Sequence, residues 1–429
     1  MTRREVLNCM GAVSAGVLLG HPVLGRLEAA TRRMAGMTPL ESAGEEIFWR
    51  EVQQSFSVSH SVINLNNAGV CACPKIVTDA VKDLTMEQEK VPPHTAFTTL
   101  PPRLETIRTA LAKLSGCDAE EIAIVRNTTE ALQAILLGVP LERGDEVLTT
   151  EHDYWAMLDA LEQRRLRDGI VVKKVPVPAP PARLDELVGI FERGITPKTK
   201  LILLSHIVNL TGQIFPVKQI CEMARTRGIE VAVDAAQSFG MIDFNIDDLG
   251  CDYFGTSLHK WLMAPKGTGM LYVRRDKIER TWPHLPPPKA FYADIRKFEA
   301  LGTIPSIPLA IGEAIAFHNG IGGKRKEARL RFLTHYWVDR LSKLPGVRFR
   351  TAFEPEMSCA IANVAIEGVD PQALLDHLWE KHRILLANPT KRAKNVRGVR
   401  VSPGLHTTLE ELDTFCEVME GIARKGLRS

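Results

Sequence analysis

The sequence lacks the features that mark several classes of protein. Its 54 lysines and arginines nearly balance 51 aspartates and glutamates, so the formal net charge is only +3. Without a basic excess or interleaved aromatic and basic residues, a dedicated nucleic-acid binder is not expected. Beyond the first 25 residues there is no long apolar run, which excludes a polytopic membrane protein. A composition of 45% hydrophobic and 24% charged residues indicates a globular chain and excludes a disordered or fibrous one.

Metal and nucleotide motifs are missing as well. Cys71-Ala-Cys73 is too closely spaced for the usual zinc pattern, and no second Cys/His pair answers it. Glu151-His-Asp153 has no second ligand cluster either, so no metal site is expected. Gly320-Ile-Gly-Gly-Lys324 lacks the spacing of a P-loop, and no G-x-G-x-x-G follows the first strand.

The first thirty residues have the pattern of an export signal. Arg3 and Arg4 precede an uncharged, weakly apolar stretch that runs from Val6 to Gly25, as in a bacterial twin-arginine (Tat) signal. The match is partial, since Val6 and Asn8 replace the usual Phe and Lys. We expect a Tat-type signal that sends the protein to the periplasm or outside the cell. A signal anchor and a cytoplasmic location are the alternatives.

The rest of the sequence alternates between helical and strand patterns. Apolar spacing predicts helices such as 104–114 and 131–137. Short β-rich runs predict buried strands at 121–125, 146–149, 170–175, 200–204, 230–233 and 270–273. Helices that alternate with buried strands indicate βαβ units and a mainly parallel sheet. A long helical stretch at 307–344 and shorter strands after it predict a second, smaller α+β domain.

Four parts of the chain follow from these patterns. They are a signal segment at 1–30, an N-terminal segment at 31–75 that joins the small domain, a large domain at 76–320, and a small C-terminal domain at 321–429.

Polar residues at predicted strand ends suggest a phosphorylated ligand. Thr128 and Thr129 open a helix, where unpaired N–H groups and the helix dipole favour a phosphate. Asp234 ends an apolar strand, where a carboxylate is costly unless a cation meets it. Lys260, in a Ser-x-His-Lys sequence, could form an imine if its charge were suppressed. Each alone is commonly a cap, a turn residue or a surface charge. Together they describe pyridoxal 5′-phosphate (PLP).

With these motifs the sequence resembles the class V aminotransferase family of fold-type I PLP enzymes, and within it the isopenicillin N epimerase-like branch, over nearly all of residues 45–425. The resemblance implies an α/β fold, with a large domain around a mainly parallel seven-stranded sheet and a smaller α+β C-terminal domain. It also implies a homodimer with active sites at the subunit interface, because Leu301-Gly-Thr303 resembles a segment whose threonine reaches the neighbouring subunit's phosphate.

The resemblance assigns cofactor roles to individual residues. Lys260 matches the lysine that links covalently to the cofactor and, once freed, moves the α-proton. The other matches are Thr128, Thr129, Ser257 and His259 at the phosphate, Asp234 at the ring nitrogen, Gln237 and Asn209 at the ring hydroxyl, and Thr303 at the neighbouring subunit's phosphate.

Substrate-site residues follow from the same resemblance. His152 and Tyr154 both match the segment that stacks an aromatic ring on the cofactor, and His152 is slightly favoured. Epimerisation would need one of them to return a proton from the face opposite Lys260. Arg400, in Val399-Arg-Val-Ser402, matches the arginine that takes the substrate carboxylate, and Asn67 matches a residue that lines the substrate site.

The implied activity is chemistry at the α-carbon or amino group of an amino acid or an amino-acid-containing peptide, by epimerisation or transamination. A lyase of the desulfurase or β-elimination type is the alternative, although residues 386–399 contain no cysteine where desulfurases carry one. The segment His406-Thr-Thr408 departs from the Y-N-T of related sequences. A non-catalytic binding module is a remote alternative, because Lys260 and Asp234 are both present.

Overall fold

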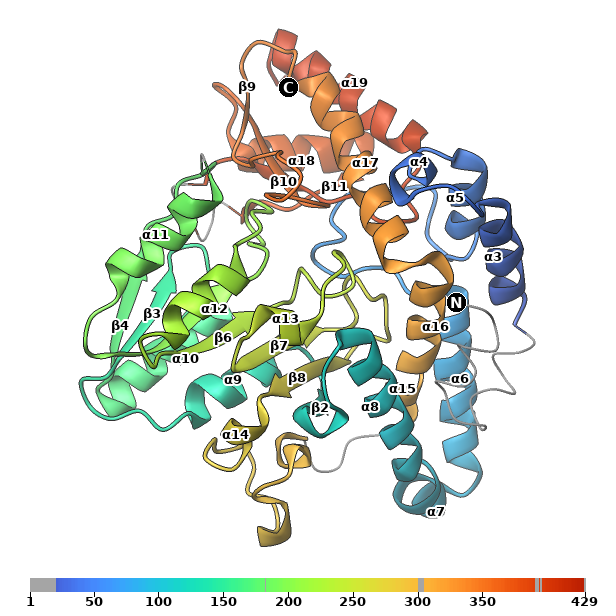
Figure 1. The fold of residues 1–429 in the computed structure, drawn as a ribbon. Helices are drawn as coiled ribbons and strands as arrows, with labels where there is room; N and C mark the ends of the chain where they lie inside the picture. The colour runs from blue at the N-terminus through green and yellow to red at the C-terminus, as the bar shows by residue number, and fades with distance from the viewer. Residues whose placement is uncertain (1–20, 182, 300–304, 390–392, 394–395, 428–429) are drawn as a thin grey trace.

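The computed structural model describes residues 21–427, except 182, 300–304, 390–392 and 394–395. Figure 1 shows a central sheet with helices on both faces and a smaller unit, built from the C-terminal part of the chain, above it. The strands are β1 (Ile63–Asn64), β2 (Ile122–Val125), β3 (Glu146–Thr150), β4 (Val171–Val175), β5 (Thr199–Ser205), β6 (Glu230–Asp234), β7 (Tyr253–Ser257), β8 (Gly269–Val273), β9 (Val347–Phe349), β10 (Ala362–Ile366), β11 (Ile384–Leu385) and β12 (Val399–Val401).

Helices connect most of these strands. The α-helices are α3 (Pro22–Arg33), α4 (Pro39–Ser42), α5 (Glu46–Gln53), α6 (Lys75–Lys90), α7 (Pro92–His94), α8 (Pro101–Ser115), α9 (Thr128–Gly138), α10 (Trp155–Asp168), α11 (Leu184–Gly194), α12 (Val217–Arg225), α13 (Ile246–Leu249), α14 (Arg275–Ile278), α15 (Ser306–Leu309), α16 (Ile311–Ile321), α17 (Gly323–Leu341), α18 (Pro371–His382) and α19 (Leu409–Lys425). Single turns of other helix types are η1 (Thr95–Thr99), η2 (Ala119–Glu121), η3 (Lys289–Phe291) and η4 (Ile295–Phe298).

The large sheet has seven strands in the order β2-β8-β7-β6-β5-β3-β4. All neighbours pair in parallel except β8, which runs antiparallel to both β2 and β7. The predicted mainly parallel, seven-stranded sheet is therefore confirmed. Its strands are apolar on both faces: Ile202 and Leu204 pack into one core cluster, and Leu201 and Leu203 into the other. This is the pattern expected when helices cover both sides of a parallel sheet.

The predicted helical stretch at 307–344 is divided into α15, α16 and α17. Gly322 separates α16 from α17 with φ of +91°, a backbone conformation that glycine adopts without a steric penalty. Apolar spacing continues across the break, which explains why the sequence pattern did not show it.

The smaller unit combines sequence from both ends of the chain. Its antiparallel sheet has the order β12-β10-β9, and β1 from the N-terminal segment pairs in parallel with β11. Leu65 joins Trp337 and Phe415 in the core of this unit. An additional bridge joins Asn66 to Ser402, which brings the N-terminal segment to the strand that carries Arg400.

The predicted signal segment is described only from residue 21, and residues 1–20 lie outside the described residues. Helix α3 contacts α5 and α16, with Val23, Leu27 and Ala30 buried. The predicted boundary at residue 30 therefore falls inside a packed helix, and export stays a prediction. Among the residues described, no helix is long and apolar enough to cross a membrane.

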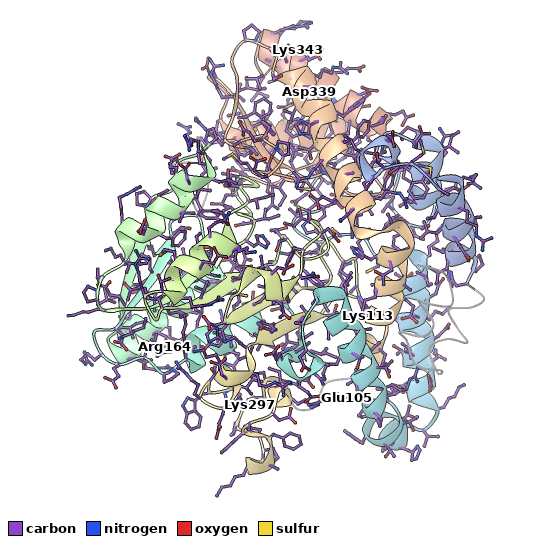
Figure 2. The ribbon with its side chains drawn as sticks, in the orientation of Figure 1. Glu105, Lys113, Arg164, Lys297, Asp339 and Lys343 are labelled. Carbon is purple, nitrogen blue, oxygen red and sulfur yellow. The ribbon has the colours of Figure 1, made fainter. Side chains whose placement is uncertain are left out.

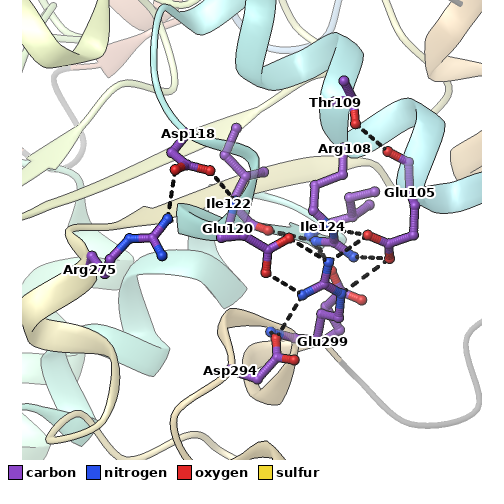
Figure 3. Close-up of polar contacts among 11 residues, drawn as sticks. Glu105, Arg108, Thr109, Asp118, Glu120, Ile122, Ile124, Arg275, Asp294 and Glu299 are labelled. Atoms are coloured by element: carbon purple, nitrogen blue, oxygen red, sulfur yellow. Dashed lines mark hydrogen bonds and ion pairs between the residues drawn. The ribbon is translucent and has the colours of Figure 1, made fainter.

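Buried cations hold the large domain together around β2 and α9. Arg108 of α8 is 1% exposed and donates to a Glu299 carboxylate oxygen at 2.6 Å, and the same oxygen accepts the Ile124 N–H at 2.9 Å (Figure 3). Arg164 of α10, which is labelled in Figure 2, donates to the carbonyls of Leu136 and Val139 at the end of α9. These contacts fix the strand that leads into α9 and the helix itself.

Close backbone packing at Gly269 provides a test of this arrangement. A Cβ at this residue, at the start of β8, would lie 2.6 Å from the Asn127 Cα that precedes α9. We expect Gly269→Ala to lower the free energy of unfolding by about 1–3 kcal/mol, as overpacking of a rigid site does, in denaturant unfolding of the protein.

Gly421→Ala is the matched control, because a Cβ there, on α19, meets nothing within 4 Å. It should raise the free energy of unfolding by about 0.5–1 kcal/mol through helix propensity. Equal unfolding midpoints for the two variants would contradict the packing account.

Candidate active site

The carboxyl edge of the large sheet gathers most of the predicted site residues. Asp234 is the last residue of β6, Ser257 is the last residue of β7, and Thr128 begins α9 three residues after the end of β2. Lys260 lies in the turn that follows β7. Because β2, β6 and β7 point the same way in the sheet, their carboxyl ends meet at one edge, where ligands bind in folds of this type.

The start of α9 offers a site for an anion. The Thr128 N–H donates to Ser257 Oγ at 2.9 Å, and the Thr128 and Ser257 hydroxyls lie 2.7 Å apart. Both side chains are buried, while Thr129 in the same turn is partly exposed. His259 is held nearby, with Nδ1 3.0 Å from the Thr268 carbonyl. Hydroxyls at a helix N-terminus suit a phosphate group.

Asp234 requires a cation. It is 5% exposed, and the Ala236 N–H donates to its carboxylate at 3.0 Å. Burial raises the pKa of Asp234 to about 6, although the Ala236 N–H and the Lys260 charge oppose the rise. A protonated ring nitrogen facing this carboxylate would supply the missing positive charge.

Lys260 is prepared to act as a nucleophile. Burial lowers its pKa to about 8, the Asp234 charge works against this shift, and the Arg400 charge adds to it. A larger share of Lys260 is therefore uncharged near neutral pH than for an ordinary lysine, and only the uncharged amine can attack an aldehyde.

Arg400 is a buried cation whose contacts are neutral. It lies in the middle of β12 and is 8% exposed. Its guanidinium donates to the Asn209 carbonyl at 3.0 Å and to Asn66 Oδ1 at 2.7 Å. Its Nε has no hydrogen-bond partner among the described residues. Burial lowers the pKa of Arg400 to about 10, and a bound carboxylate would offset that burial.

A cavity of about 250 Å³ opens next to Arg400. It is lined by Glu151, Asp153, Tyr154, Trp155, Leu158, Asn209, Leu210, Ala387, Asn388, Pro389 and Arg400. Tyr154 interacts electrostatically with Arg400 and opposes the fall in its pKa. His152, the other candidate for stacking on the cofactor, is 1% exposed and is not among the residues that line the cavity.

Asn66, which the sequence patterns did not single out, contacts Arg400, whereas Asn67 is engaged elsewhere. The Asn67 amide donates to the carbonyls of Asn64 and Ser402 at 3.0 and 3.1 Å. Its Oδ1 lies 2.9 Å from Nε2 of His406, the residue that departs from the Y-N-T pattern. Asn67 therefore joins the N-terminal segment to the small unit, and His406 belongs to that joint. Neighbouring asparagines in a segment without regular periodicity gave no signal that could separate the two roles.

Gln237 and Asp153 organise the same edge. The Gln237 amide donates to the Ala68 carbonyl at 2.9 Å and accepts from the Trp261 indole at 2.8 Å, which leaves one N–H for the predicted ring-hydroxyl contact. Asp153 was not predicted to have a role. Its carboxylate accepts the Thr150 N–H at 2.8 Å and the Ser205 N–H at 2.6 Å, so it ties the ends of β3 and β5 together. Thr149 and Thr150, whose hydroxyls also donate to the Asp153 carboxylate, were the sequence signal that could have indicated this role.

Two other expectations concern Thr303 and a metal site. Thr303, predicted to reach a neighbouring subunit's phosphate, lies outside the described residues. Within the described ranges, no group of three or more His, Cys, Asp or Glu side chains is placed to hold a metal ion. The groups that are present fit PLP: a hydroxyl-lined helix start for its phosphate, the Asp234 carboxylate for its ring nitrogen, and the Lys260 amine for its aldehyde.

Comparison with known proteins agrees with this fit. The family model of class-V aminotransferases matches residues 63–415. Isopenicillin N epimerase from Streptomyces clavuligerus is 29% identical over 392 residues, which cover 87% of this chain and 98% of that protein. Isopenicillin N epimerase from Amycolatopsis lactamdurans is 30% identical over 397 residues, which cover 88% and 99%.

Solved structures share the fold. The apo structure of a cysteine desulfurase from Thermococcus onnurineus NA1 has a TM-score of 0.77 at 24% identity and covers 88% of this chain and 98% of its own. A C-DES mutant with glycine covalently linked to its PLP cofactor has a TM-score of 0.75 at 21% identity, with 86% and 98% covered. Because the family model spans most of the sequence, from β1 into α19, the chain belongs to the class-V aminotransferase family, and its cofactor is pyridoxal 5′-phosphate.

Proposed function

We propose that the protein breaks and remakes the Cα–H bond of an amino acid or an amino-acid-containing peptide, as an epimerase or an aminotransferase. The observation that carries the proposal is the buried guanidinium of Arg400, which among the described residues has only neutral hydrogen-bond partners and which lines a cavity and interacts electrostatically with Lys260. PLP, when bound, supplies a ring that withdraws electrons from the substrate's α-carbon.

The residues divide this task by their chemistry. Arg400 can hold the substrate carboxylate through two parallel hydrogen bonds, which fixes the orientation of the α-carbon. Asp234, as a carboxylate, stabilises the positive charge on the ring nitrogen. The Lys260 amine, with its pKa lowered to about 8, accepts the α-proton and can return it.

Epimerisation has support beyond the shared site. The two isopenicillin N epimerases align over nearly their whole length. Epimerisation needs a second proton donor on the face opposite Lys260, and Tyr154, which lines the cavity and interacts electrostatically with Arg400, is the candidate. Transamination needs only Lys260 to move the proton, so the same residues could also perform it. Substrate configuration and products separate the two reactions.

A carbon–sulfur lyase is the second candidate, because relatives include a protein described as a probable cysteine desulfurase from Xylella fastidiosa, 30% identical over 349 residues. The thiols weaken the desulfurase form of this candidate, which needs a cysteine nucleophile, but not a β-elimination. Residues 386–399 contain no cysteine. Cys359, the nearest one before them, is 2% exposed, and burial raises its pKa to about 12. A thiol in that state is a poor nucleophile.

A homodimer and export complete the proposal. Phe97, in the turn η1 that follows α7, is 78% exposed, and Trp282, after α14, is 67% exposed. Exposed apolar groups of this size suit a subunit interface.

Export by the Tat route would carry the folded protein with its cofactor. Cleavage ahead of Pro22 would leave α3 whole.

Incubation in deuterated water tests the proposed reaction. The PLP-loaded protein is mixed with amino acids and with peptides that carry a free α-amino-acid end. We expect deuterium at the α-carbon together with inverted configuration, or conversion of the amine to a keto acid, because the Cα–H bond is the one broken. Mass spectrometry and chiral chromatography read both results. Release of sulfide or pyruvate without α-exchange in recovered substrate would replace the proposal with the lyase.

Cofactor loading should depend on pH through Lys260. The rate at which added PLP becomes trappable by borohydride should rise with pH and level off above about 8, because the uncharged amine attacks and its pKa is lowered to about 8. An ordinary lysine would give a rise that continues to about pH 10.

Lys260→Ala is the control for this measurement and should give no trappable link at that site. A loading rate that keeps rising to about pH 10, or a link that survives in Lys260→Ala, would show that a different lysine reacts.

Substitutions of Arg400, Asn66 and Asn67 should affect substrate binding and stability to different degrees. Arg400→Met should lower kcat/KM by about 10–150-fold, the loss expected for a hydrogen bond to a charged group. Asn66→Ala should raise KM more weakly, because it removes one contact that orients Arg400. Asn67→Ala should mainly lower the unfolding midpoint, because its contacts join the N-terminal segment to β12. Steady-state kinetics and unfolding curves are measured for all three variants. A larger loss of kcat/KM in Asn66→Ala or Asn67→Ala than in Arg400→Met, or an unfolding midpoint in Asn67→Ala that is not the lowest of the three, would refute these assignments.

A further inference from the structure

Lys326 is a buried lysine behind the catalytic turn. It lies in the first turn of α17 and is 1% exposed. Its ammonium donates to the carbonyl of Trp261 and lies 3.4 Å from Nδ1 of His318. No carboxylate in the described part of the chain forms an ion pair with it. A buried ammonium held only by neutral groups lowers stability, so its presence calls for another reason.

The neighbours of Lys326 favour a hydrogen-bond donor at this place. Burial and the Lys326 charge hold the pKa of His318 well below its usual range, so its imidazole is neutral and can accept a hydrogen bond. The Cys71 thiol, also buried, is the other titratable group that interacts with Lys326. Burial lowers the pKa of Lys326 to about 7, and the side chain remains a donor in both protonation states.

The group that Lys326 holds directly follows Lys260. The Lys260 turn is closed by the Met263 N–H, which donates to the Lys260 carbonyl at 2.9 Å. Met263 has φ of +61°, a left-handed conformation that is unfavourable for a non-glycine residue and persists only where the surroundings enforce it. Two contacts restrain Trp261 within this turn: its indole donates to Gln237, and its carbonyl accepts from Lys326.

The position of Lys326 in the chain adds to its significance. His318 is on α16 and Lys326 on α17, on opposite sides of the break at Gly322. Helix α17 continues into the small unit, where Trp337 belongs to the core. The Lys326 ammonium therefore joins the Lys260 turn to the point where the chain passes from the large domain to the small unit.

We propose that Lys326 is a positioning residue for Lys260: it holds the Trp261 carbonyl and so fixes the direction from which the Lys260 amine meets the cofactor. The proposal rests on the role of Lys260 in the proposed function. It assigns Lys326 no contact with substrate or cofactor.

Lys326→Met tests the proposal, with Lys324→Met as the matched control, because Lys324 is exposed on the same turn of α17. The PLP dissociation constant, the rate of borohydride-trappable loading and the unfolding midpoint of the apoprotein are measured for both variants and the wild type. We expect Lys326→Met to weaken PLP binding and slow loading by about tenfold or more, as loss of a hydrogen bond that orients a reacting group does. Its apoprotein should unfold at a midpoint close to that of the wild type, because removal of a buried charge without an ion-pair partner among the described residues offsets the hydrogen bond lost at the Trp261 carbonyl.

Lys324→Met should match the wild type in all three measurements. Loading and PLP affinity within about twofold of wild type in Lys326→Met, well below the loss of one charged hydrogen bond, would overturn the proposal. An apoprotein destabilised in parallel with PLP loss would also overturn it, since that result marks a purely structural residue. Lys326→Leu, which also removes the donor, is measured by the same criteria if the Met variant does not fold. A wild type that takes up no PLP would instead contradict the cofactor site itself.

Discussion

Burial of charge at the carboxyl edge of the large sheet is the constraint on which the rest of this structure depends. The pKa values of Asp234, Lys260 and Arg400 move to about 6, about 8 and about 10, each in the direction that loss of water dictates. No ion pair within the described residues joins these groups to one another. A protein tolerates such groups when a ligand completes them. A ring cation, an aldehyde and a carboxylate are the complements that these three side chains require.

The N-terminal segment makes this arrangement possible. It carries Asn66 to the guanidinium of Arg400 and Asn67 to His406, and the Ala68 carbonyl receives the amide of Gln237. Contacts between residues more than 160 positions apart therefore hold the guanidinium of Arg400, the group proposed to bind the substrate carboxylate. The segment also pairs with β11, so the small unit and the cofactor edge are held by one continuous stretch of backbone.

Much of the cofactor edge could be predicted from the sequence, because Asp234 ends a buried strand and Thr128 and Lys260 lie three residues beyond the ends of two others, and strands that point the same way bring these ends to one edge. The seven-stranded sheet followed from a family resemblance that those motifs carried. Side-chain pairings over long distances could not be predicted. Nothing local separates Asn66 from Asn67. Lys326 lies in a stretch that the sequence pattern predicts as one helix, and the break at Gly322 does not interrupt the apolar spacing. Such roles depend on which distant backbone groups remain without a partner after the chain has folded.

The most direct measurement of the central claim is a crystal structure of the protein with PLP and a non-reactive amino-acid analogue. The account predicts the phosphate at the Thr128–Ser257 hydroxyls, the ring nitrogen against Asp234, the aldehyde carbon within bonding distance of the Lys260 amine, and the analogue's carboxylate on the Arg400 guanidinium. A ring bound away from Asp234, or a carboxylate held by another cation while Arg400 keeps only its neutral partners, would contradict it.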